Sequence, residues 1–151
     1  MLPLKKILCP TDFSDPSFEA MKVATELALH FSSELIAIHV VAPISVIATE
    51  YTSPAAFDAQ EYQQVMEASS MKTLEEQIEK RIPEGVSVRR MLSLGDPANQ
   101  IVHTAEDEKV DLIVIATRGQ TGLKRLVFGS VAEKVVRLST RPVLSIRDRH
   151  P

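Results

Sequence analysis

The sequence predicts an α/β fold in which helices cover both faces of a parallel sheet, so that the molecule has three layers. Short apolar runs typical of buried strands alternate with longer segments in which apolar residues recur at helical spacing. Such alternation favours parallel strands joined by helical crossovers. The 151 residues suit a single domain, and no repeat, low-complexity tract or linker divides them. We therefore expect one domain over residues 1–151.

The first part of the chain predicts two strands with a helix between them. Residues 5–10 form a short apolar run that ends at a proline, and residues 34–41 form a second run rich in Ile and Val. Between them, Ser14 offers an N-cap and Pro16 a first-turn proline for a helix. One face of that helix is apolar, with Ala20, Ala24, Leu27, Ala28 and Phe31.

Residues 42–58 interrupt the alternation, because two prolines and scattered Ser and Thr residues favour a loop. Long loops in compact domains are usually lids or interaction surfaces. A polar-rich helix follows over residues 59–81, where Pro83 and Gly85 end it.

The alternation then resumes to the end of the chain. Asp96 is the expected N-cap and Pro97 the first residue of a third helix. The remaining elements are strands over residues 86–94, 110–116 and 142–146 and a helix over residues 130–139.

Composition excludes several classes of protein. The net charge of −3 argues against general nucleic-acid binding, which favours a strongly basic domain. No stretch approaches the roughly 18 apolar residues that a membrane helix needs, and no signal peptide is visible. We expect a cytoplasmic protein with no membrane insertion. The single cysteine, Cys9, lies in an apolar run, which predicts a buried and inert thiol.

The strongest functional signal lies between the predicted fourth strand and the fourth helix. Residues 117–128 include three basic residues, Arg118, Lys124 and Arg125, and no acidic residue. The helix start that follows supplies unpaired N–H groups and the positive end of a helix dipole, where phosphate binds readily. This arrangement predicts an anion as the ligand, and specifically a nucleotide phosphate.

A second polar group follows the first strand, at Pro10, Thr11 and Asp12. In open α/β sheets, ligands bind beyond the carboxyl ends of the strands where the strand order reverses. If the first and fourth strands are neighbours, both loops meet in one crevice. Asp12 would then accept hydrogen bonds from a ribose hydroxyl or an adenine amine, while Gly119, Gly129 and Ser130 hold phosphates.

Each of these features also has a purely structural interpretation. Asp12 can cap a turn near Ser14, and Ser130 with Glu133 fits a capping box. The basic residues can form an ordinary solvated face. The glycines can serve only to supply positive φ angles, at Gly119, Gly122 and Gly129.

Catalytic chemistry has little support in this sequence. The four histidines are scattered, no pair has metal-ligand spacing, and Cys9 has no evident base. His39 lies inside a predicted strand, which favours a core histidine with its hydrogen bonds satisfied. We expect no catalytic residue, no protein-held metal and no enzymatic activity beyond weak ATP hydrolysis.

Two blocks of the sequence resemble the universal stress protein family. Residues 6–14 are similar to the family's first strand and turn, and residues 111–143 to its C-terminal signature. ATP-binding members carry Gly, two residues, Gly, nine residues, then Gly followed by Ser or Thr. Gly119 and Gly129–Ser130 match this pattern, but Ala116 occupies the first glycine position. The added methyl group is expected to crowd a bound nucleotide, weakening its binding without abolishing it.

The resemblance implies a Rossmann-like sheet of five parallel strands in the order 3-2-1-4-5, as in adenine nucleotide alpha hydrolases. It implies a stress-response or regulatory protein that binds ATP or AMP, with Mg²⁺ or Mn²⁺ held largely by phosphate oxygens and water. It also implies a homodimer formed through residues 142–146, and an unidentified regulatory protein partner. The implied nucleotide-binding residues are Pro10, Thr11, Asp12, Val40, Ile115, Ala116, Thr117, Arg118, Gly119, Gly129, Ser130 and Val131.

Two alternatives stay open at this point. The chain can be an interaction module of the same fold that binds no nucleotide, which the departure at Ala116 favours slightly. It can also be a slow ATPase, which the lack of a recognisable general base makes the least favoured of the three.

Overall fold

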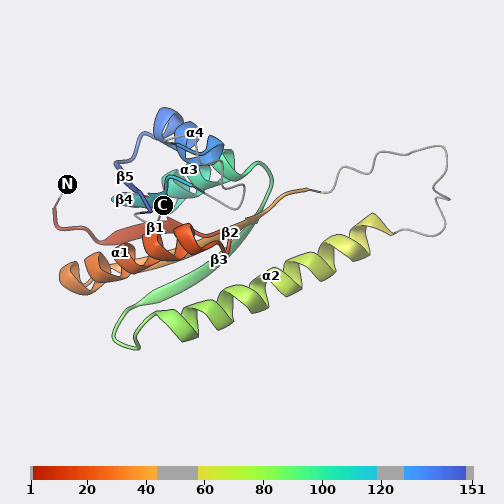
Figure 1. Cartoon of the computed structure of the whole chain (residues 1–151), viewed down its shortest axis with the longest axis horizontal. Helices are drawn as coiled ribbons and strands as arrows, with labels where there is room; N and C mark the ends of the chain where they lie inside the picture. The colour runs from red at the N-terminus through yellow and green to blue at the C-terminus, as the bar shows by residue number, and fades with distance from the viewer. Residues whose placement is uncertain (1, 44–57, 119–127, 149–151) are drawn as a thin grey trace.

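The computed structural model describes residues 2–43, 58–118 and 128–148. They form a five-stranded parallel sheet in the order β3-β2-β1-β4-β5, as predicted. The edge strands of this sheet are therefore β3 and β5 (Figure 1). The strands are β1 (Lys6–Pro10), β2 (Glu34–Val41), β3 (Val88–Leu94), β4 (Leu112–Ala116) and β5 (Val143–Ile146). The helices are α1 (Asp15–Phe31), α2 (Ala59–Arg81), α3 (Pro97–Asp107) and α4 (Ser130–Leu138).

The strand order reverses beside β1, which pairs with β2 on one side and with β4 on the other. After β1 the chain builds β2 and β3 outward in one direction, then crosses back to add β4 and β5 on the other side. The prediction that the first and fourth strands are neighbours is therefore confirmed. Their carboxyl ends, which lead to Thr11 and Thr117, lie at the same edge of the sheet.

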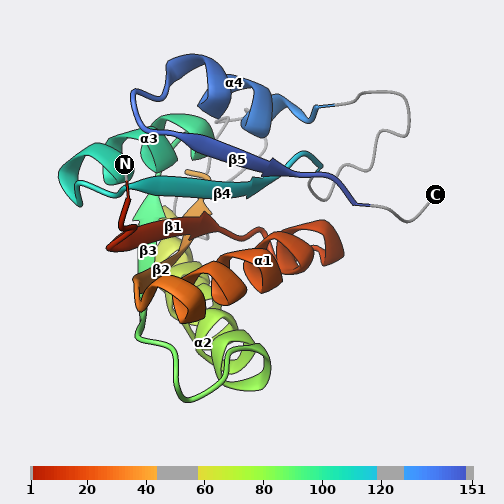
Figure 2. The same ribbon diagram turned by 90° about the vertical axis from the view of Figure 1, so that its left-hand side faces the viewer.

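The helices cover the two faces of the sheet in pairs, with α1 and α2 on one face and α3 and α4 on the other (Figure 2). Side chains alternate between the faces along each strand. In β4, for example, Val114 and Ala116 belong to the core beneath α1, whereas Ile113 and Ile115 belong to the core beneath α3 and α4. This alternation decides which side chains face the site described below.

Element boundaries agree closely with the sequence-based prediction, and the differences have local causes. The helix at Ala59–Arg81 and the strand at Glu34–Val41 have the predicted bounds. The third strand begins at Val88 because residues 83–86 form a turn, in which the Val86 N–H donates to the Pro83 carbonyl at 3.1 Å. The predicted loop over residues 42–58 lies almost wholly outside the described residues.

The predicted helix starts at Ser14 and Asp96 are confirmed. The Ser14 side chain accepts from the Ser17 N–H, and the Asp96 carboxylate accepts from the Asn99 N–H at 3.0 Å. Cys9 is fully buried, and burial raises the pKa of its thiol to about 12, as expected for an inert side chain. No helix in the described parts of the chain is long and apolar enough to cross a membrane.

A cluster of charges ties β2 and β3 to the end of α3, at the edge of the sheet opposite the carboxyl ends of the strands. The Arg89 guanidinium donates to Glu34 at 3.0 Å and to Glu108 at 3.1 Å. Lys6 also lies 3.6 Å from the Glu108 carboxylate. Because these residues come from three strands and a helix end, the cluster holds together the amino ends of the strands, on the side of the sheet away from the site.

Candidate functional site

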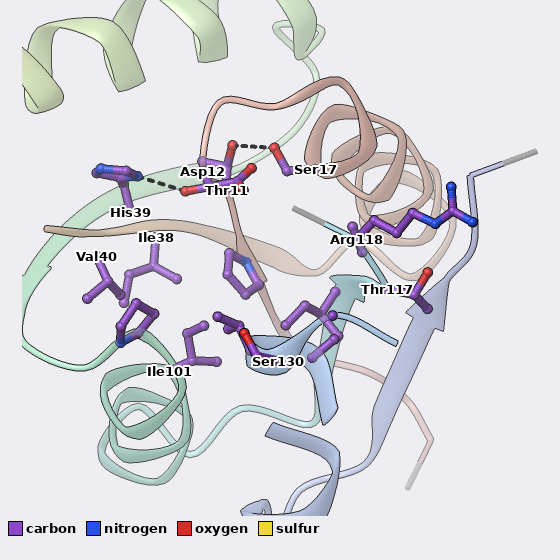
Figure 3. A pocket seen from close by; sticks show the side chains of 17 residues that line it. Thr11, Asp12, Ser17, Ile38, His39, Val40, Ile101, Thr117, Arg118 and Ser130 are labelled. Carbon is purple, nitrogen blue, oxygen red and sulfur yellow. Dashed lines mark hydrogen bonds between the residues drawn. The ribbon is translucent and has the colours of Figure 1, made fainter. Parts of the chain in front are cut away.

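A cavity of about 260 Å³ opens at the carboxyl edge of β1, β2 and β4, where the first turns of α3 and α4 also meet (Figure 3). Every residue predicted for the site lies on its wall except Gly119, which lies outside the described residues. The structure thus brings the two strand exits together, as the sequence predicted. The roles of these residues in binding a ligand remain predictions. The lining residues are Pro10, Thr11, Asp12, Ser17, Ile38, His39, Val40, Pro97, Ile101, Ile115, Ala116, Thr117, Arg118, Gly129, Ser130, Val131 and Ala132.

One part of the wall is apolar. Ile38, Ile101 and Ile115 come from β2, α3 and β4, and all three belong to the core beneath α3 and α4. Val40 packs against the same core. Small-molecule sites typically combine such apolar walls with a few well-placed polar groups. This part of the cavity is suited to a flat ring system.

The turn between β1 and α1 supplies polar groups to the wall. The Ser14 N–H donates to Asp12 Oδ1 at 3.0 Å, and the Ser14 hydroxyl donates to the same oxygen. The Phe13 N–H donates to the Thr11 hydroxyl at 3.1 Å. Asp12 therefore caps the turn, as one interpretation of the sequence held, and it also lies on the cavity wall.

The structural interpretation of Ser130 and Glu133 as a capping box is wrong, because α4 starts differently. Gly129 is the N-cap, and the described residues provide no side-chain cap hydrogen bond to the first turn of the helix. Ser130 is already helical, so its hydroxyl is not in the capping position. Next to the cavity wall, the backbone N–H groups of the first turn are therefore left without a side-chain cap from the described residues. Such groups, together with the helix dipole, favour an anion.

Gly129 does not serve to supply a positive φ angle. Its φ is −69° and its ψ is 160°, an extended conformation that any residue adopts. The purely structural interpretation is thus wrong for this glycine. Gly119 and Gly122 lie outside the described residues. The Gly129 N–H donates to the Thr117 carbonyl, which ties the start of α4 to the end of β4.

The methyl group of Ala116 lies on the face of the sheet that α1 covers. It belongs to the core beneath α1, together with Ala20 and Met21. Ala116 is also absent from the residues with positive φ, so the position has no conformational need for glycine. Ala116 nevertheless lines the cavity, and crowding of a bound nucleotide by its methyl group stays a prediction.

Charged side chains on the described wall are few. Arg118 is the cationic side chain and Asp12 the carboxylate among the described lining residues. The Thr117 hydroxyl is buried and has no hydrogen-bond partner among the residues that the structure describes. An unpartnered buried hydroxyl calls for an explanation, and a polar ligand atom would satisfy it. Within residues 2–43, 58–118 and 128–148, no three His, Cys, Asp or Glu side chains gather to hold a metal ion.

Sequence reasoning missed six lining residues: Ser17, Ile38, His39, Pro97, Ile101 and Ala132. Alternation along β2 could have found Ile38, because it lies two residues before Val40 and shares its face. His39 was expected in the core. It has the expected hydrogen bond, with Nδ1 2.8 Å from the Thr11 carbonyl, but it is only half-buried and lies at the cavity.

Comparison with known proteins supports one family. Residues 3–147 match the model of the universal stress protein family. Universal stress protein MJ0531 of Methanocaldococcus jannaschii is 38% identical, over 95% of this chain and 82% of the relative. The structure of UspA from Lactobacillus plantarum superimposes with a TM-score of 0.79 at 25% identity, covering 95% of this chain and 98% of that one. A universal stress protein in complex with cAMP superimposes with a TM-score of 0.69 at 22% identity, covering 95% and 97%.

Proposed function

The chain belongs to the universal stress protein family, and from that premise we propose that its cavity binds an adenine nucleotide. The protein would act in the cytoplasm as a regulatory factor of the stress response rather than as an enzyme. Binding of ATP or AMP would shift the protein between two conformations, which requires that the nucleotide bind the two conformations with different affinities.

The observation that carries this proposal is the position of the uncapped start of α4 beside an apolar wall in one cavity. The first-turn N–H groups and Arg118 supply what a phosphate group needs. Ile38 and Ile101 offer a surface on which a purine ring can lie. Asp12 supplies a carboxylate that can accept hydrogen bonds from ribose hydroxyls.

Two further findings support the proposal. The buried hydroxyl of Thr117 lacks a partner within the described part of the chain and would gain one from a polar ligand. A protein of the same fold is known in complex with cAMP, although at 22% identity this likeness shows the fold alone. A divalent cation would be held by the phosphate oxygens and water, since the described lining residues offer one carboxylate.

Self-association through β5 is the second part of the proposal. β5 is an edge strand, and its residue Leu144 is 38% exposed. Val136 and Leu138 of the neighbouring α4 are also exposed apolar residues. An edge strand with exposed apolar neighbours is suited to pairing with a second copy. Substituting Leu144 by Lys is expected to convert a dimer into a monomer in light scattering.

The first experiment identifies any nucleotide that is released when freshly purified protein is denatured, by mass spectrometry. Calorimetric titrations with Mg-ATP, AMP and adenosine follow on the same protein. Binding that is weakened in Asp12→Ala but not in Asp15→Ala, a matched change at the exposed first residue of α1, supports the site. No released nucleotide and no heat at millimolar ligand would instead favour the nucleotide-free interaction module. Phosphate release that disappears in Gly129→Val would favour the slow ATPase.

A further inference from the structure

His39 occupies an unusual position at the end of β2. Its neighbours Ile38 and Val40 contact the core beneath α3 and α4, so strand alternation places the imidazole on the opposite face, toward α1. There its ring stacks on Phe13, with centroids 4.3 Å apart and planes 24° apart. Its Nδ1 lies 2.8 Å from the Thr11 carbonyl (Figure 3). Because a carbonyl only accepts, Nδ1 carries the hydrogen.

This hydrogen bond replaces a rung of the β1–β2 ladder. The Thr11 N–H donates to the Ile38 carbonyl at 2.9 Å, as in a regular parallel pair. The next rung would join the Val40 N–H to the Thr11 carbonyl. Pairing instead ends at Pro10 and Ile38, and in the described chain the Thr11 carbonyl accepts from His39. The Val40 N–H points to the same side as the Ile38 carbonyl, the described backbone hydrogen bonds include none from it to Thr11, and Val40 lies on the cavity wall.

The same imidazole supports the turn that presents Asp12. Phe13, the next residue, has a φ of +65°, a left-handed conformation that costs a bulky side chain energy and persists only where the surroundings impose it. The His39 ring covers the Phe13 ring, and its Nδ1 holds the carbonyl two residues earlier in the chain. His39 thus contacts the turn on both sides of Asp12.

We propose that His39 is a positioning residue that frees the Val40 N–H for the ligand and fixes the turn carrying Asp12. The inference rests on the proposed nucleotide function and refines it. A free N–H at the apolar wall matches adenine, whose N1 is an acceptor, and opposes guanine, whose N1 carries a hydrogen. His39 would therefore favour adenine over guanine without touching either base.

The test compares two amide substitutions in the full-length protein. In His39→Asn the side-chain NH₂ group occupies the place of Nδ1, whereas in His39→Gln it lies one bond further out. His103→Asn, on the exposed face of α3, is the matched control. Affinities for ATP and GTP are measured by calorimetry, and the exchange rate of the Val40 amide hydrogen is measured by NMR without ligand.

Wild type, His39→Asn and His103→Asn are expected to prefer ATP to GTP. His39→Gln is expected to bind ATP about tenfold more weakly, the effect of about one hydrogen bond, and to lose most of that preference. Its Val40 amide should exchange more slowly than in wild type, because the N–H closes the ladder rung with Thr11. A change in melting temperature alone would not produce this pattern.

The proposal is overturned if His39→Gln keeps wild-type affinity and base preference, or if the Val40 amide is already protected in wild type. If wild type binds neither nucleotide, the proposed function fails, while Val40 exchange still decides the role of His39. If His39→Gln does not fold, His39→Phe keeps a stacking ring while removing the donor. It is then expected to show the same slowed exchange and the same loss of ATP affinity.

Discussion

Replacing Gly129 by Val separates the phosphate site from the stability of the fold. Gly129 has φ −69° and ψ 160°, a conformation that Val adopts readily, so the substitution introduces no backbone strain. Loss of glycine's freedom in the unfolded chain stabilises the fold by about 0.4–1 kcal/mol. Val is a poorer N-cap than Gly, which offsets a similar amount. The free energy of unfolding should therefore change by less than about 1 kcal/mol.

Nucleotide affinity should change much more. The isopropyl group is added at the residue that precedes the uncapped first turn of α4. There, phosphate oxygens would accept hydrogen bonds from the backbone N–H groups. Losing one to two charge-assisted hydrogen bonds costs about 2–4 kcal/mol, which is roughly a 30-fold to 1,000-fold rise in Kd for ATP. Adenosine has no phosphate, so its affinity should fall far less.

Calorimetric titration of ATP, AMP and adenosine into both proteins measures this difference, and urea unfolding measures stability. Gly85→Val is the matched control, because a Cβ there meets nothing closer than Leu29 at 4.0 Å, well away from the cavity. Equal ATP affinity in Gly129→Val and wild type would refute the phosphate site at α4. An equal loss for adenosine would show that the substitution distorts the whole cavity.

Three further predictions concern the rest of the fold. The hydrogen bond from Arg89 holds the pKa of the Glu108 carboxyl below its ordinary value. The stability that the ionised carboxylate contributes is therefore present at neutral pH and is lost as the pH falls through the folded-state pKa. Urea unfolding from pH 7 to 3 should show that acidification lowers the free energy of unfolding less in Glu108→Gln than in wild type. Cys9 should resist a thiol reagent at pH 8 until the protein unfolds, because it is fully buried and its pKa is raised to about 12; rapid labelling of the folded protein would contradict this. Leu74, 1% exposed, anchors α2 to the core, so Leu74→Ala should lower the free energy of unfolding by about 2–5 kcal/mol, and a loss under 1 kcal/mol would show that α2 contributes little to stability.

Local signals in the sequence were sufficient for the fold. The helix starts at Ser14 and Asp96 depend on side chains that act within three residues, and both are confirmed. The apolar runs indicated the strands, and their alternation with helices indicated the parallel sheet. The strand order came from resemblance to the universal stress protein family, because nothing within one strand indicates which strand will lie beside it.

The candidate site was predicted less completely, because tertiary contacts decide its details. Ser130 followed three residues later by Glu133 fits a capping box in which Ser130 is the N-cap. In the fold, the hydrogen bond from the Gly129 N–H to the Thr117 carbonyl fixes the chain before the helix, and Gly129 is the N-cap instead. Likewise, the position of His39 in an apolar strand suggested the core. Only the fold shows that β2 ends beside the Thr11 carbonyl, which the imidazole then takes as its partner.

Ala116 shows how a motif and its physical basis can come apart. The family pattern has glycine at this position, which suggested that a methyl group would crowd the ligand. In the fold, Ala116 is the last residue of β4, and strand alternation directs its side chain into the core beneath α1, away from the wall formed by Ile115. Its backbone also lacks the positive φ angle that would require glycine. The fold therefore gives no backbone reason for glycine at position 116, and the proposal depends on the uncapped start of α4.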